Sequence, residues 1–150
     1  MLTCKVSTQD PTFCALTKRL DKELASRHGT LQSHYDAHNV VEHMETAVVG
    51  FVEKKGIACG CFKPVDTTTV EIKRMFVAPN HRRKGYSSAL LEELEVWART
   101  LGFTHARLET GKGQPEAIAL YQKHGYAITS NFPPYVGMDN SVCMHKSLYM

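Results

Sequence analysis

The stretch from Thr69 to Gly102 has the pattern of a β-strand, a basic loop and an amphipathic helix, in that order. Residues 69–78 alternate as a strand does, and Pro79 ends the alternation. One face of this strand is expected to carry Val70, Ile72 and Phe76, and the other Glu71, Lys73, Met75 and Val77. Beyond the loop, apolar residues recur at helical spacing, at Leu90, Leu91, Leu94, Trp97, Ala98 and Leu101. Gly102 is expected to end this helix.

Patterns on both sides of this unit predict further strands and helices. Strands are expected over 2–6, 105–110, 126–129 and 141–148, and a hairpin over 46–65 around Lys54–Gly56. Helices are expected from Asp10–Pro11 to Gly29, over 31–44, and from Pro115 to Gly125. This order predicts a mixed α/β fold in which helices pack on one sheet, and the length of 150 residues fits a single domain, 1–150.

Composition narrows the class of protein. The net charge is only +3, which argues against a general nucleic-acid or membrane binder. Hydrophobic residues make up 43% of the chain, which is enough for a real core. No apolar run approaches the length of a membrane span, and the first residues lack a signal peptide's apolar segment. Five cysteines form no recognisable disulfide framework, so we expect reduced thiols in a cytoplasmic protein.

The loop before the central helix concentrates positive charge at Arg82, Arg83 and Lys84. Cations at a helix start oppose the helix dipole, which is already positive there. A bound anion would remove this conflict, because free N–H groups at a helix start bind phosphates and Gly85 permits close backbone approach. The alternative is a solvated basic turn before a surface helix.

The segment from Glu71 to Tyr126 resembles the GNAT superfamily of acyl-CoA-dependent N-acetyltransferases. The family signature is Arg or Gln, two residues, Gly, one residue, and Gly or Ala; residues 82–87 match it, with Ser87 in the last place. The segment "LETG…EAIALYQKHGY" is similar to the family's later strand and helix. The resemblance covers residues 46–148 and implies a central, mostly antiparallel sheet flanked by helices. Small GNAT proteins with "EIKRM" and an ending like Ser141–Leu148 are the most similar.

The resemblance implies a binding site for acetyl-CoA. Its pyrophosphate is expected on the backbone N–H groups of residues 83–88, with Arg82 and Lys84 nearby, and its pantetheine arm along the strand backbone from Met75 to Val77. One strand N–H is also expected to polarise the thioester carbonyl. The expected cofactor-binding residues are Met75, Phe76, Val77, Arg82, Arg83, Lys84, Gly85, Tyr86, Ser87 and Ser88.

Two side chains are candidates for the chemistry. Tyr121 is the candidate general acid that protonates the leaving thiolate; alternatively it is a core aromatic residue that packs with Ile118. Glu71 is the candidate base for the acceptor ammonium; alternatively it pairs with Lys73 on the same strand face. Glu109, on the next strand, is the second carboxylate candidate.

Two further residues are candidates for contact with the acceptor. Arg74 occupies an apolar position in the strand alternation and needs a partner. We favour a buried carboxylate as this partner, with a carboxylate of the acceptor as the alternative. Tyr135 lies in a Pro- and Gly-bearing loop of the kind that often covers an acceptor, or is a plain surface tyrosine.

We expect no metal site. His34 and His38 are four residues apart, but no Glu follows the first as a metalloprotease motif needs, and no distant ligand is evident. Cys59 and Cys61 are expected to be packed thiols.

The resemblance therefore predicts acetyl transfer from acetyl-CoA to a primary amine by direct attack in a ternary complex, with a small-molecule amine as the favoured acceptor. A non-catalytic acyl-CoA-binding module is the alternative. A nucleic-acid binder is disfavoured because the cations form one short cluster without an aromatic platform. Many relatives are dimers, which leaves a homodimer open.

Overall fold

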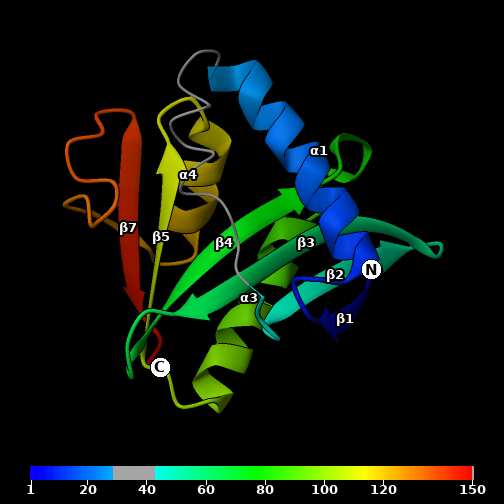
Figure 1. The fold of residues 1–150 in the computed structure, drawn as a ribbon, viewed down its shortest axis with the longest axis horizontal. Helices are drawn as coiled ribbons and strands as arrows, with labels where there is room; N and C mark the ends of the chain where they lie inside the picture. Colours follow the sequence, from blue (N-terminus) through cyan, green and yellow to red (C-terminus); the bar gives the residue numbers. More distant parts are fainter. Residues whose placement is uncertain (29–42, 150) are drawn as a thin grey trace.

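The computed structural model describes residues 1–28 and 43–149 and contains a seven-stranded sheet (Figure 1). The strands are β1 (Leu2–Val6), β2 (Ala47–Val52), β3 (Lys55–Pro64), β4 (Thr69–Val77), β5 (His105–Gly111), β6 (Ala127–Thr129) and β7 (Ser141–Ser147). Their order is β1-β2-β3-β4-β5-β7-β6, and every neighbouring pair is antiparallel except β4 and β5. The expected mixed α/β fold with a mostly antiparallel sheet is confirmed.

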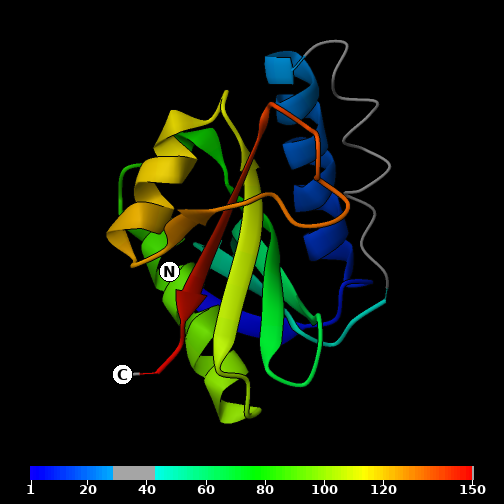
Figure 2. The same ribbon diagram turned by 90° about the vertical axis from the view of Figure 1, so that its left-hand side faces the viewer.

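Helices cover both faces of this sheet. The helices are α1 (Pro11–His28), α3 (Tyr86–Thr100), α4 (Pro115–Lys123) and a short 3-10 helix (Pro79–His81). Figure 2 shows α1 on one side of the sheet and α3 and α4 on the other. The helix predicted over 31–44 falls almost entirely outside the described residues.

Local sequence signals explain where the helices begin and what they bury. The Asp10 carboxylate accepts a hydrogen bond from the Phe13 backbone N–H at 3.1 Å, the cap expected for α1. Apolar residues at helical spacing are buried in α1 (Leu16, Leu20, Leu24) and in α3 (Leu90, Leu91, Leu94, Ala98). The prediction for Leu101 was wrong: it follows the last turn of α3 and is 53% exposed.

The hairpin of β2 and β3 turns at Glu53 and Lys54. Both residues have positive φ, 51° and 67°, as a tight two-residue hairpin turn requires. The hairpin is confirmed, and its turn begins one residue before the predicted Lys54–Gly56.

A bulge in β4 changes the side-chain alternation at Arg74. Cys59 of β3 is opposite Phe76, but Cys61 is opposite Lys73, so β4 has one extra residue between these pairs. The backbone of Arg74 has φ 59°, in the left-handed region. One extra residue in a strand reverses the sheet face of every strand residue that follows it.

The bulge corrects the predicted faces of β4. Ile72 pairs with Phe62, whose ring packs edge-on against Trp97 of α3, whereas Phe76 lies under the guanidinium of Arg19 from α1. Ile72 and Phe76 therefore face opposite sides of the sheet. The strict alternation was wrong because it assumed an unbroken strand.

The cysteines all lie in the described part of the chain, and none forms a disulfide. Cys59 and Cys61 are fully buried, and their Sγ atoms donate to backbone carbonyls of β4. Burial raises the pKa of each thiol to about 12, so both remain protonated at neutral pH, as expected for packed thiols.

Within residues 1–28 and 43–149, no helix has the combination of length and apolar character that a membrane span requires.

Candidate active site

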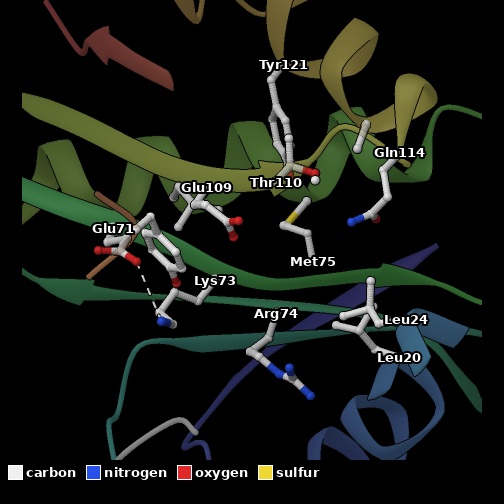
Figure 3. A pocket seen from close by; sticks show the side chains of 14 residues that line it. Leu20, Leu24, Glu71, Lys73, Arg74, Met75, Glu109, Thr110, Gln114 and Tyr121 are labelled. Carbon is white, nitrogen blue, oxygen red and sulfur yellow. Dashed lines mark ion pairs between the residues drawn. The ribbon is translucent and has the colours of Figure 1, made fainter. Parts of the chain in front are cut away.

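The candidate site lies where β4 and β5 separate. The two parallel strands pair only from Thr69–His105 to Glu71–Arg107, and their remaining residues diverge. Two hollows occupy this opening: a pocket of about 110 Å³ between the strands (Figure 3) and a groove of about 770 Å³ that extends to the basic loop. They share Leu20, Met75, Gln114, Ala117 and Tyr121 in their walls, so they meet at one junction.

The structure gathers the predicted residues around these hollows. The pocket is lined by Glu71, Arg74, Glu109 and Tyr135, together with Met75 and Tyr121 at the junction. The groove is lined by every predicted cofactor-binding residue except Lys84. Residues expected to act together from sequence are therefore close in space.

The basic loop presents unbonded N–H groups to the groove. The first backbone bond of α3 runs from the Ala89 N–H to the Gly85 carbonyl, and no side chain caps the helix. Among the described residues, none accepts a hydrogen bond from the N–H groups of residues 83–88. Arg83 and Gly85 have positive φ, 63° and 81°, which is the kind of backbone that forms an anion-binding nest.

Arg82 already has partners within the protein. Its Nε donates to the Val77 carbonyl at 2.8 Å, and its guanidinium pairs with Glu23 of α1 at 2.8 Å. The charge conflict at the start of α3 is thus partly resolved internally. Arg83 and Lys84 are exposed, and neither belongs to an ion pair between described residues.

The end of β4 offers an open edge to a ligand. Residues 72–77 pair with β3 on one side, but on the β5 side no described strand pairs with them. This edge includes Met75–Val77, and these three residues also line the groove. An extended ligand arm can therefore hydrogen-bond there as an added strand would.

Tyr121 is buried and reaches from α4 toward the pocket (Figure 3). Its ring packs edge-on against Tyr126, at 5.8 Å between ring centres. The structure records no hydrogen bond between its hydroxyl and any described residue. Burial and the nearby charge of Glu109 raise the pKa of Tyr121 above its ordinary value, so its hydroxyl stays protonated at neutral pH.

The two carboxylates of the pocket have different partners. Glu71 is 4% exposed and pairs with Lys73 at 3.5 Å and Arg107 at 3.2 Å. Glu109 accepts a hydrogen bond from the Ser141 hydroxyl at 2.8 Å. Burial is the largest cause of a pKa for Glu109 above its ordinary value; the charge of Glu71 also raises it, whereas Ser141 and Lys73 lower it.

Arg74 and Tyr135 form other parts of the pocket wall. Arg74 donates to the Thr17 carbonyl at 2.9 Å and pairs with Asp21 at 2.7 Å, so its partner is a carboxylate as favoured, but a half-exposed one. Tyr135 is 2% exposed, which rules out a plain surface tyrosine. Asn131 holds the Tyr135 loop by donating to its backbone carbonyls.

Several residues of the site were missed from the sequence. Arg107 pairs with Glu71 and lies 3.9 Å from the centre of the Phe132 ring. Thr110 and Gln114 line the pocket. Arg107 shares the period-two alternation with Glu109, which could have indicated that both side chains face the site.

The histidine pair considered as a metal site, His34 and His38, lies outside the described residues. In the part of the chain that the structure describes, no group of three or more His, Cys, Asp or Glu side chains is placed to hold a metal ion.

Comparison with known families identifies the class of protein that this fold and site define. The sequence profile of the Acetyltransferase (GNAT) family matches residues 13–126, more than half of the chain. An IAA acetyltransferase from Azospirillum brasilense is 44% identical over 78 residues, which cover 52% of this chain and 51% of the relative. The chain belongs to the GNAT acetyltransferase family. The matched part spans between 30% and 61% of the length of the curated relatives, and about half of the first.

Solved structures agree with this assignment. A protein from Klebsiella pneumoniae, assigned as an acyl-CoA N-acyltransferase, is 30% identical with a TM-score of 0.82, and the match covers 99% of this chain and 97% of that one. A GNAT family acetyltransferase from Elizabethkingia anophelis with acetyl-CoA bound shares the fold at 22% identity and a TM-score of 0.59, over 67% of this chain and 74% of that one.

Proposed function

We propose that this protein transfers an acetyl group from acetyl-CoA to a primary amine. The observation that carries the proposal is the junction of the two hollows at Met75 and Tyr121. The groove suits a long ligand with an anionic group at the loop and its reactive end at the junction. The pocket suits a second substrate that approaches the same point from the other side.

The residues of the groove fit the parts of acetyl-CoA. The unbonded N–H groups of residues 83–88 bind the pyrophosphate. The open edge at Met75–Val77 holds the pantetheine arm, and one N–H there stabilises negative charge on the thioester oxygen. Tyr121 donates its proton to the leaving thiolate. The Elizabethkingia anophelis GNAT structure with acetyl-CoA bound supports this choice of acetyl donor.

The pocket favours a small cationic amine that attacks directly. Two carboxylates line it, buried Glu71 and half-buried Glu109, and such groups attract an ammonium group and can remove its proton. In the described part of the chain no cysteine lines either hollow, so a ternary complex explains the geometry without an acyl-enzyme intermediate.

Thiol release tests this proposal. The purified protein is incubated with acetyl-CoA and a panel of amino acids, diamines, arylalkylamines and an aminoglycoside. We expect release of free CoA that depends on one class of amine, with a product heavier by one acetyl group. A non-catalytic acyl-CoA-binding module would instead bind acetyl-CoA and release no thiol with any amine.

A further inference from the structure

The two pocket carboxylates differ in which oxygens are already occupied. Both oxygens of Glu71 have cationic partners: Oε1 accepts from Arg107 at 3.2 Å, and Oε2 lies 3.5 Å from Lys73 Nζ. In contrast, the Ser141 hydroxyl donates to Oε2 of Glu109, and Oε1 accepts no hydrogen bond from a described residue. None of the ion pairs between described residues includes Glu109. Oε1 of Glu109 is not sealed off from solvent, so it is open to the pocket.

The backbone explains why the two side chains are directed differently. Glu71 lies in the paired part of β4, opposite Arg107 of β5. Glu109 lies two residues after Arg107, where β5 has separated from β4. Figure 3 shows the Glu109 carboxylate directed into the space beside Met75, while Glu71 is turned toward Lys73. Glu109 is therefore the carboxylate that faces the junction where the thioester is expected.

We propose that Glu109 is the catalytic base, and that Glu71 instead anchors Lys73 and Arg107. This inference rests on the proposed function. Glu109 takes one proton from the acceptor ammonium, so that an N–H bond breaks and an O–H bond forms on the carboxylate. The neutral amine attacks the thioester carbon, the C–S bond breaks, and Tyr121 protonates the thiolate. The second proton, which the nitrogen loses as the amide forms, returns to Tyr121, and Glu109 releases its proton to solvent.

The groups around Glu109 suit this role. The titratable and polar side chains that face it are Glu71 and Lys73 from β4, Tyr121 from α4, Tyr135 from the loop before β7, and Ser141 and Cys143 from β7. Burial raises the pKa of Glu109 toward neutral pH, which makes a carboxylate a stronger base. The charge of Glu109 in turn raises the pKa of Tyr121 and so keeps the acid protonated. Neighbouring groups with different protonation states are the arrangement that acid–base catalysis needs.

The matched variants Glu109→Gln and Glu71→Gln test the assignment. The measurement is kcat/KM for acetyl-CoA-dependent thiol release, with the best amine of the panel, from about pH 6 to about pH 10. For Glu109→Gln we expect a loss of about 100-fold or more near neutral pH. This loss should shrink as pH approaches the pKa of the amine, because the amine then becomes neutral without a base. For Glu71→Gln we expect a smaller loss that is the same at every pH. Both variants should bind acetyl-CoA like the wild type.

Ser141→Ala gives an independent test that leaves both carboxylates in place. The Ser141 hydrogen bond lowers the pKa of Glu109, so its removal should move the acidic limb of the pH profile to higher pH. If Glu109→Gln fails to fold, this shift shows whether Glu109 is the base. A wild-type pH profile in Glu109→Gln, with the low-pH activity lost in Glu71→Gln, would overturn the assignment. Absence of thiol release by the wild type with every amine would instead reject the proposed function itself.

Discussion

The guanidinium of Arg82 lies 2.8 Å from the carboxylate of Glu23 and links the signature loop to α1. Both residues line the groove, about one third and one quarter exposed. Glu23 thus places a negative charge in a groove that we propose for an anionic ligand. The ion pair stabilises the empty protein and opposes binding at the same time.

Substitutions in this pair should have opposite effects on binding. For Glu23→Gln we expect acetyl-CoA affinity to rise about threefold, because a competing anion is removed, with a loss of about 0.5 kcal/mol in unfolding free energy. For Arg82→Ala we expect weaker binding and a loss of about 1–2 kcal/mol, because the hydrogen bond to Val77 also disappears. Calorimetric titration and denaturant unfolding measure both. Weaker binding in Glu23→Gln would show that Glu23 helps to bind the ligand.

Two neighbouring tyrosines should separate catalysis from stability. For Tyr121→Phe we expect thiol release to fall about 100-fold with little change in unfolding free energy, because its hydroxyl bonds to no described residue. The Tyr126 hydroxyl donates to buried Glu95 at 2.8 Å. Tyr126→Phe should therefore cost about 1–3 kcal/mol of stability and leave most of the activity. Full activity in Tyr121→Phe would remove the acid role.

Thiol accessibility should follow burial. The pKa of about 12 for Cys59 and Cys61 predicts that neither reacts with iodoacetamide in the native protein near neutral pH, whereas exposed Cys4 does. Mass spectrometry of labelled peptides gives the result, with denatured protein as the control. Loss of thiol release after labelling of Cys4 alone would be inconsistent with direct attack.

Local patterns in the sequence were sufficient to predict most of the strands and helices. Capping at Asp10 and apolar spacing in α3 act over a few residues, so the sequence shows them directly. The bulge at Arg74 was missed because it depends on pairing with β3. For the same reason, two other features could not be predicted: the ion pair between Arg107 and Glu71, and the point at which β4 and β5 stop pairing. The partners of a charged residue depend on the whole sheet.

Calorimetric titration with acetyl-CoA tests the central claim most directly, with dephospho-CoA and adenosine as comparison ligands. The variants are Arg83→Glu, in the groove wall, and Lys84→Glu, which is next to it but outside the wall. We predict micromolar binding of acetyl-CoA, no binding of adenosine, a loss of about tenfold or more in Arg83→Glu, and a smaller loss in Lys84→Glu. No binding at millimolar acetyl-CoA would contradict the account, because the unbonded N–H groups of the loop would then have another ligand.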